Sequence, residues 1–242
     1  MCGRYELHSQ PAAIALAFGL AEIPALAARY NIAPMQRVPI VRRNAQGANE
    51  LVDVRWGFVP RRAKDPSIGV RMINARAETV ARRPAFRNAF DRHRCLLPAD
   101  GFYEWLTSSQ RKRPVHVGMR GGTLFGMAGL CERWLSEDGE VLDTCCIITT
   151  AANAMLRDVH DRMPAIIAPE DYDRWLDPAN ADASDLLVPF TGDAMTWRSV
   201  SSRVNAVLND DASLIEPASQ TDLFEGDPSA DDERIPVQAS LL

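Results

Sequence analysis

The sequence predicts an α+β fold built around a curved antiparallel sheet or barrel. Many short segments are rich in β-branched and aromatic residues, and Pro, Gly or Ser turns separate them. Helical segments are few, and strands and helices do not alternate regularly, which excludes a doubly wound parallel sheet. A chain of 242 residues with 46% hydrophobic content can bury a full core, so a disordered or fibrous protein is also excluded.

The order of the expected elements follows from local composition. The first helix is expected at residues 11–20, followed by strands at 38–42 and 51–56, the second of them alternating, and by a helix at 84–92. Strands then dominate, with expected bounds of 94–97, 101–106, 115–119, 124–130 and 141–149. The last part is expected to hold short helices near 153–159 and 170–176, and strands near 165–168 and 195–200.

The domain organisation is expected to be simple. No internal repeat and no Gly/Ser linker divides the chain, so one domain is predicted over residues 2–217. Residues 218–242 are expected to form an acidic, disordered tail, because nine acids and only Arg234 occur over residues 207–242, among Pro, Ser and Ala. No apolar run approaches the roughly 18 residues of a membrane span, and the first residues do not resemble a signal peptide.

The charges are segregated along the chain, although the net charge is -5. Residues 37–94 contain fourteen Arg or Lys against five acids. A basic region of this kind is typical of a phosphate-binding surface, because neutralising phosphates releases counterions. A solvated charged face is the alternative interpretation of the same composition.

Several familiar chemistries have no sequence support. The chain has no GxGxxG, GxxxxGK[ST] or GxSxG motif, so a nucleotide cofactor is not expected. Five cysteines without a framework spacing favour free thiols in a reducing cytosol. There is no CxxC, and adjacent Cys145 and Cys146 in a strand would point to opposite faces, so we expect these two and Cys131 to be packing residues and predict no metal site.

Cys2 is the first candidate for chemistry. Removal of Met1 is expected, since aminopeptidases accept a small second residue, and it would leave an α-amine and a thiol on one residue. The α-amine has a reference pKa of about 7.7 to 8.0, so a useful fraction is neutral and nucleophilic at pH 7. The thiol could then close on an imine to give a thiazolidine. A cysteine at this position by chance is the alternative.

Few other amines are available for such chemistry. Only Lys64 and Lys112 among the 27 basic residues are lysines, and both lie among polar neighbours that do not indicate desolvation. A mechanism that needs a neutral amine therefore favours the α-amine of Cys2.

Two further residues lie where packing alone does not require a titratable group. Glu104 shares a face of its strand with Phe102, so burial is expected to raise its pKa toward the working pH. His160 adjoins Asp161 and Arg162 at an element boundary. A structural ion pair for Glu104 and a surface or capping role for His160 are the alternatives.

The chain resembles the SOS-response-associated peptidase, or abasic-site processing, family over residues 2–217. The segments that carry the resemblance are Cys2-Gly3-Arg4-Tyr5, Tyr30-Asn31-Ile32-Ala33-Pro34, Trp56-Gly57, Asn74-Ala75-Arg76-Ala77-Glu78-Thr79, residues 94–105, residues 125–134, His160-Asp161-Arg162-Met163-Pro164 and residues 200–217. The resemblance implies a single domain built on a distorted, mostly antiparallel β-barrel with short peripheral helices. It also implies a monomeric cytoplasmic protein, associated with the nucleoid on DNA damage, that crosslinks to abasic sites in single-stranded DNA without a cofactor.

The resemblance also implies roles for individual residues. Cys2 would be the nucleophile and attachment point, Asn74 would position its amine, and Glu104 and His160 would transfer protons. The implied DNA contacts are Arg4, Arg76 and Arg162 with phosphates and Pro34, Trp56 and Thr149 along the path of the strand. One departure concerns Arg61-Arg62, which stand where the family commonly has tryptophan, so Arg62 is a candidate contact in place of that ring.

Three other functions remain open from the sequence. In a cysteine peptidase, Cys2 would attack a peptide carbonyl with His160 as base, and self-cleavage would use the same groups. A non-enzymatic single-strand binding module would need the basic surface but neither Glu104 nor His160. In the third case, all of these residues serve packing. Covalent capture of an aldehyde-bearing DNA separates the abasic-site hypothesis from all three.

Overall fold

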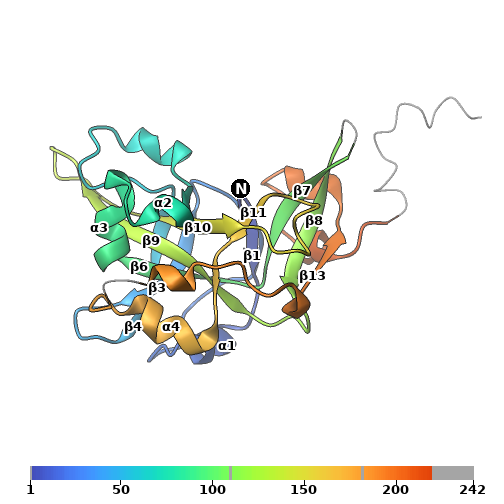
Figure 1. The fold of residues 1–242 in the computed structure, drawn as a ribbon, viewed down its shortest axis with the longest axis horizontal. Helices are drawn as coiled ribbons and strands as arrows, with labels where there is room; N and C mark the ends of the chain where they lie inside the picture. The colour runs from blue at the N-terminus through green and yellow to red at the C-terminus, as the bar shows by residue number, and fades with distance from the viewer. Residues whose placement is uncertain (1, 109–110, 181–182, 220–242) are drawn as a thin grey trace, which may run out of the picture.

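The computed structural model describes residues 2–108, 111–180 and 183–219, and Figure 1 shows their arrangement. A closed barrel and a second, five-stranded sheet lie side by side in this view. The predicted α+β barrel with short helices is confirmed. The predicted tail falls largely on residues 220–242, which lie outside the described residues.

The barrel closes because β10 pairs with both β4 and β9. Its strands are β3 (Arg37–Arg43), β4 (Asn49–Trp56), β6 (Arg94–Ala99), β9 (Phe125–Leu135) and β10 (Val141–Ala151). The β4–β10 pair is parallel and the other pairs are antiparallel. One face of β6 and of β10 lines the barrel interior and helices pack against the other face, which explains the nearly continuous apolar runs of these strands.

Short strands extend the barrel at one end. β5 (Asn74–Arg76) pairs parallel to β10, and β11 (Arg162–Pro164) pairs antiparallel to it. β12 (Ile166–Ile167) pairs with β9. β10 thus carries β5 and β11 near its carboxyl end, where much of the predicted site falls.

The second sheet is antiparallel throughout. Its order is β13 (Met195–Ser199), β8 (Arg111–Met119), β7 (Gly101–Ser108), β1 (Tyr5–Leu7) and β2 (Arg29–Ile32). Tyr5 of β1 lies opposite Phe102 of β7. This pairing places the start of the chain beside β7, which carries Glu104.

Helices lie at the periphery of the sheets. They are α1 (Pro11–Ala17), α2 (Ala77–Val80), α3 (Pro84–Arg92) and α4 (Tyr172–Leu176). The 3-10 segments are η1 (Pro66–Arg71), η2 (Pro169–Asp171), η3 (Ser184–Leu186), η4 (Gly192–Ala194), η5 (Ser202–Asn205) and η6 (Ala212–Ile215). Pro at the start of α1 and α3 fits the first turn of a helix, where its missing N–H costs nothing.

The structure differs from the expected elements in two respects. The segment expected as a short helix near 153–159 forms turns over residues 154–159, with the side chain of Asn153 accepting the backbone N–H of Leu156 at its start. The strands β1, β2, β5 and β11 and the helix α2 were not among the expected elements. Each has only three or four residues, too few to show a hydrophobic period.

The core follows the composition of the strands. Trp56, Trp175 and Phe58 are among its largest fully buried side chains. All five cysteines are free and buried, as the sequence predicted for Cys131, Cys145 and Cys146. No helix within the described ranges is long and apolar enough to cross a membrane.

Candidate functional site

The site forms where the barrel meets the second sheet. Cys2 precedes β1 and is fully buried. The side-chain Nδ2 of Asn74, on β5, donates a hydrogen bond to the Cys2 carbonyl oxygen at 2.8 Å. Asn74 is itself fixed because it lies opposite Ile147 in the parallel β5–β10 pair. The first residues of the chain are therefore tied to the carboxyl end of β10.

The thiol of Cys2 is not a ready thiolate. Burial raises its pKa well above the usual value, and the nearby Glu104 carboxylate raises it further. The backbone N–H of Arg4 donates to the sulfur and acts in the opposite direction. At neutral pH the sulfur is therefore protonated, and it can add to a carbon only as its proton is transferred away.

Glu104 is the buried acid of the site. It lies on β7 opposite Val115 and is 3% exposed. Burial raises the pKa of its carboxyl to about 7, and the Asp161 carboxylate acts in the same direction. The predicted effect of burial on this pKa is thus present, and Glu104 can donate or accept a proton near neutral pH.

His160 lies directly before β11, half-buried, beside Asp161. Its Nδ1 accepts the backbone N–H of Arg162 at 2.9 Å and lies 3.0 Å from Asp161 Oδ1. Burial lowers the pKa of the ring. Its Nδ1 also lies 3.3 Å from the carbonyl oxygen of Arg162, so protein groups surround this nitrogen and position the ring.

Two of the predicted phosphate ligands lie on neighbouring short strands. Arg76 is exposed on β5, opposite Thr149 of β10. Arg162, on β11, donates from Nη1 and Nη2 to the carboxylate of Glu78, with the Nη2 bond at 3.0 Å. Its Nη2 also donates to the carbonyl oxygen of Thr149. Arg76 is therefore open to solvent, whereas Arg162 is held by protein groups.

Arg4 is also held within the protein. Its Nη1 donates to Asn31 Oδ1 and to the carbonyl oxygen of Val204, each at 2.7 Å. The guanidinium lies over the ring of Trp105 at 6.0 Å from the centroid. The structure thus gives Arg4 a tethering role between β1, β2 and η5, and its contact with a phosphate stays a prediction.

The residues predicted to line a strand differ in exposure. Trp56 is fully buried, with its Nε1 donating to the carbonyl oxygen of Ile73 at 2.9 Å, and Thr149 is 1% exposed. Both are packing residues in the free protein. Pro34 is partly exposed in a tight turn whose next residue, Met35, has a φ of 70°, a strained value for a side chain of this kind. Arg62 is exposed.

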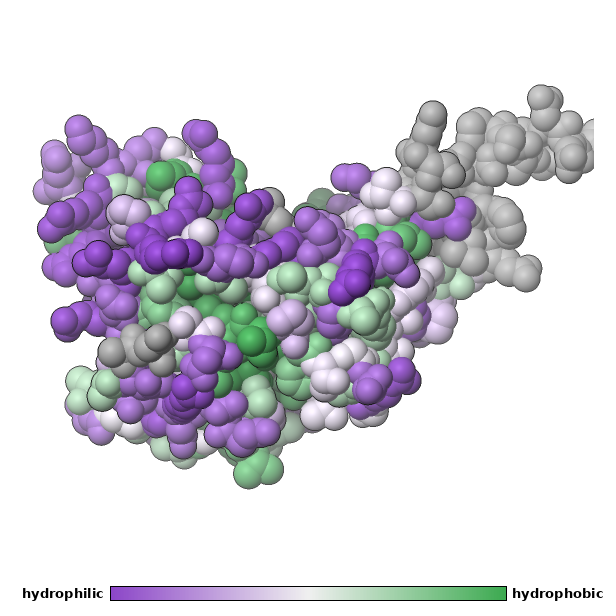
Figure 2. Space-filling model, in the orientation of Figure 1, coloured by the Kyte–Doolittle hydropathy of each residue, from purple (hydrophilic) through white to green (hydrophobic). Residues whose placement is uncertain are grey.

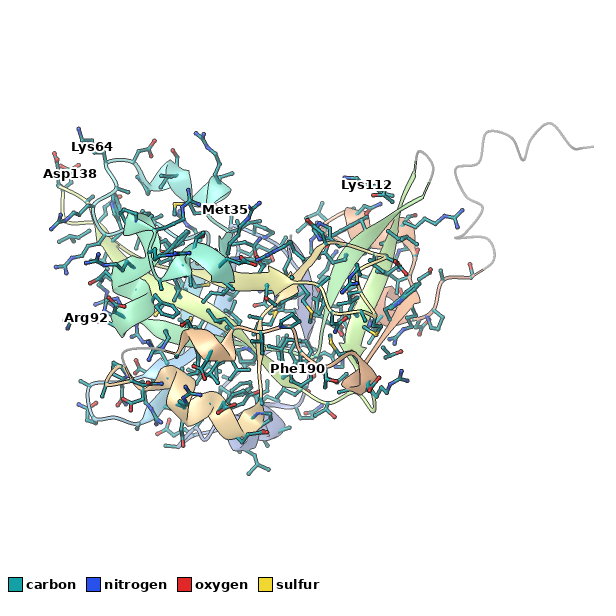
Figure 3. All side chains as sticks on the ribbon, in the orientation of Figure 1. Met35, Lys64, Arg92, Lys112, Asp138 and Phe190 are labelled. Carbon is teal, nitrogen blue, oxygen red and sulfur yellow. The ribbon has the colours of Figure 1, made fainter. Side chains whose placement is uncertain are left out.

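The two lysines lie away from each other at the surface. Figure 3 shows Lys64 and Lys112 at the outer edge of the molecule, on opposite sides of the view. Both side chains are exposed, so nothing in their surroundings desolvates their ammonium groups.

Basic side chains gather on the surface of η1, α2 and α3 and the segments beside them. Figure 2 shows hydrophilic surface over α2 and α3. The exposed basic residues of this region are Arg61, Arg62, Lys64, Arg71, Arg76, Arg82, Arg83 and Arg87. Because α2 directly follows β5, part of this charge adjoins Asn74 and Arg76.

Comparison with protein families identifies the chain. The family model described as SOS response associated peptidase (SRAP) matches residues 1–207. The chain belongs to this family. The SRAP relatives include the abasic site processing protein YoaM of Bacillus subtilis (strain 168), 40% identical over 89% of this chain and 98% of YoaM.

Further SRAP relatives span bacteria and animals. The abasic site processing protein YedK of Escherichia coli (strain K12) is 30% identical over 90% of this chain and 100% of its own length. The abasic site processing protein HMCES of Gallus gallus is 31% identical over 78% of this chain and 66% of its own length. A crystal structure of a Bacteroides thetaiotaomicron protein is similar in fold, with a TM-score of 0.81, 26% identity and coverage of 90% of this chain and 100% of that one.

Sequence reasoning missed several residues of this SRAP site. Glu78 lies within a motif that the sequence singled out, but its ion pair with Arg162 joins residues 84 positions apart. Asn31 and Trp105, which contact Arg4, also lie in singled-out motifs without an assigned role. Among the described residues, no group of three or more His, Cys, Asp or Glu side chains is arranged to hold a metal ion.

Proposed function

We propose that this SRAP protein captures abasic sites in single-stranded DNA by forming a thiazolidine through Cys2 after Met1 is removed. The observation that carries the proposal is the position of Cys2, buried beside Glu104 with its carbonyl held by Asn74 at 2.8 Å. The relatives named abasic site processing proteins support DNA-lesion processing as the general activity.

The amine acts before the thiol. The α-amine of Cys2 attacks C1 of the ring-opened deoxyribose, and loss of water from the carbinolamine gives an imine. The Cys2 sulfur then adds to the same carbon, and its proton passes to the nitrogen. One C–N and one C–S bond form, the aldehyde oxygen leaves as water, and no electron acceptor is needed. The raised pKa of the thiol supports this order, because a protonated sulfur is a weak first nucleophile.

Glu104 and His160 divide the proton transfers. With a pKa of about 7, Glu104 can protonate the leaving hydroxyl of the carbinolamine and then accept the thiol proton. The neutral imidazole of His160 can accept the hydroxyl proton of the sugar hemiacetal and so promote opening to the aldehyde. Both groups would act in reverse during release of the crosslink.

The partner is expected to be a single strand without sequence preference. Arg76 is exposed on the same short strand as Asn74, and both it and the exposed Arg62 suit phosphate oxygens, while flat or apolar side chains such as Pro34 can lie against bases. Arg4 and Arg162 would contribute to DNA binding only if their hydrogen bonds to protein acceptors were replaced by hydrogen bonds to phosphate. An abasic nucleotide has no base to read, so recognition through the backbone fits this lesion.

General cysteine peptidase activity has less support. A peptidase needs a thiolate or a base poised to make one, whereas burial and Glu104 stabilise the protonated thiol of Cys2. Self-cleavage next to Cys2 remains a related reaction of the same groups.

The test is intact-mass analysis of purified protein before and after exposure to an abasic oligonucleotide. The expected product is protein lacking Met1 joined to the oligonucleotide with loss of one water, and it should survive heating. Cys2→Ser should give at most a labile adduct, and Cys2→Ala the same labile imine or none. A heat-stable adduct of Cys2→Ala would contradict the proposal.

A further inference from the structure

The guanidinium of Arg162 is occupied by a carboxylate in the free protein. Glu78 accepts from Nη1 and Nη2 together, an end-on arrangement that a phosphate could also adopt. Arg162 Nε is buried and has no hydrogen-bond partner within the described part of the chain. The side chain of Arg162 is 15% exposed and that of Glu78 is 52% exposed, so Glu78 can swing into solvent while Arg162 stays in place.

This pair lies at the same end of β10 as Cys2. Arg162 contacts Thr149, and Thr149 follows Ile147, the β10 residue opposite Asn74, by two positions. Two residues of a strand span about 7 Å. Because Asn74 holds Cys2, the cation at Arg162 and the aminothiol are attached to neighbouring positions of one strand.

A reactive aminothiol creates a problem of selectivity. The thiazolidine reaction needs only an aldehyde, and free sugar phosphates carry both an aldehyde and a phosphate. Such a molecule matches the two ends of the site, a cation at Arg162 and a nucleophile at Cys2. A protein that must stay available for DNA therefore needs a means of rejecting phosphorylated aldoses.

We propose that Glu78 is the specificity-determining residue that rejects phosphorylated small aldehydes by occupying Arg162. This inference rests on the proposed function of Cys2. A small molecule with one phosphate must displace the Glu78 carboxylate from Arg162. It makes no other phosphate contact that would offset the loss of this ion pair. A DNA strand presents several phosphates at once, so contacts such as the one at Arg76 raise the effective concentration of the phosphate that competes at Arg162.

The experiment compares two aldehydes in two proteins. Wild type and Glu78→Gln are incubated with ribose 5-phosphate or with ribose, and the rate of adduct formation at Cys2 is followed by intact mass. Gln keeps the shape and hydrogen bonding of Glu78 while removing its charge. The matched control is Asp185→Asn, which removes one charge from the exposed Arg174–Asp185 pair on η3 and α4.

The expected result is that Glu78→Gln forms an adduct faster with only one of the two aldehydes. Relative to wild type, Glu78→Gln should react about five- to tenfold faster with ribose 5-phosphate and at the same rate with ribose, because an ion pair of this kind contributes about 1 kcal/mol. Asp185→Asn should match wild type with both. DNA binding is also measured with an intact, unreactive strand, as the slope of the logarithm of affinity against the logarithm of salt concentration (the salt slope). This slope should be steeper by about one unit in Glu78→Gln.

Two failures are distinguishable. If the ratio of the ribose 5-phosphate rate to the ribose rate is the same in Glu78→Gln and in wild type, and the salt dependence of DNA binding is unchanged, the inference about Glu78 is wrong. The proposed function would still stand. If wild type forms a stable adduct with neither abasic DNA nor ribose, the proposed function is wrong. The inference about Glu78, which rests on it, is then wrong as well.

Discussion

Asn74 and Cys2 are joined by a hydrogen bond from the Asn74 side-chain amide to the Cys2 carbonyl oxygen, at 2.8 Å. The other end of the same amide, Oδ1, is buried and has no partner within the described residues. A neutral α-amine on Cys2 would supply the missing donor. Asn74 therefore suits the task of fixing both the carbonyl and the amine of one residue.

This relationship gives the first prediction. Asn74→Ala should slow crosslink formation by about 10²-fold, because small misplacements of a nucleophile cost that much, while leaving DNA affinity unchanged. Single-turnover kinetics with protein in excess over abasic oligonucleotide measures the rate. The matched control is Asn88→Ala, which removes an exposed amide from α3. A wild-type rate in Asn74→Ala would assign Asn74 to packing.

The second prediction concerns the rate of Glu104→Gln as a function of pH. Crosslink formation in wild type should rise as the α-amine loses its proton and should fall again above about pH 7, where the Glu104 carboxyl ionises and can no longer donate. Glu104→Gln should lose the inflection near pH 7, with formation and reversal slower by about 10²- to 10⁴-fold. An unchanged profile would remove Glu104 from the chemistry.

The third prediction concerns the stability of the same variant. The folded-state pKa of Glu104 is raised from 4.5 to about 7, so the native state holds this proton more tightly than the unfolded chain does. The free energy of unfolding of wild type should therefore fall as pH rises from about 4.5 to 7. Glu104→Gln should be close to wild type at pH 4 and more stable than wild type at pH 8, by about 1 to 3 kcal/mol. Denaturant titrations at the two pH values test this, and a variant less stable at pH 8 would contradict it.

The fourth prediction separates His160 from binding. His160→Ala should slow adduct formation by about 10²- to 10⁴-fold, because a proton acceptor for ring opening is lost, with nearly the same affinity for the strand. Since burial lowers the pKa of the ring, the wild-type rate should not depend on a charged imidazole at pH 7. His93→Ala, at the end of α3, is the control. Equal rates in the two variants would reduce His160 to a structural residue.

The fifth prediction concerns binding without chemistry. Arg76→Ala should weaken binding to any single strand and lower the salt slope by about one unit, because one phosphate contact is lost. Arg62→Ala tests in the same way whether Arg62 contacts the strand. Arg92→Ala, exposed at the end of α3, controls for the loss of one charge. A slope equal to that of the control would place the residue outside the DNA surface.

The longer strands of both sheets could be predicted because their sequences are long enough to show a pattern. The predicted segment 141–149 lies within β10 (Val141–Ala151), and 101–106 lies within β7 (Gly101–Ser108). The raised pKa of Glu104 was predictable for the same reason, since alternation places it on the face of Phe102. The local pattern could not predict the closure through the parallel β4–β10 pair, which joins Arg55 to Thr144, 89 positions further along the chain.

The contacts of the arginines were less predictable. Nothing local distinguishes the exposed Arg76 from Arg4 and Arg162, whose acceptors lie far away in the sequence. Every residue has a backbone carbonyl, so the sequence does not indicate that Arg4 will donate to the carbonyl of Val204. These contacts depend on tertiary placement.

The burial of Cys2 also constrains the order of events during synthesis. The groups that contact it or lie in the same site are made much later, with Asn74 on β5, Glu104 on β7 and His160 before β11. At roughly 5 to 20 residues per second, about 8 to 32 seconds separate synthesis of the first residue from synthesis of position 160. Removal of Met1, on which the proposed chemistry depends, therefore has its natural window on the nascent chain. Slower trimming or faster closure would leave molecules that are folded but permanently unreactive.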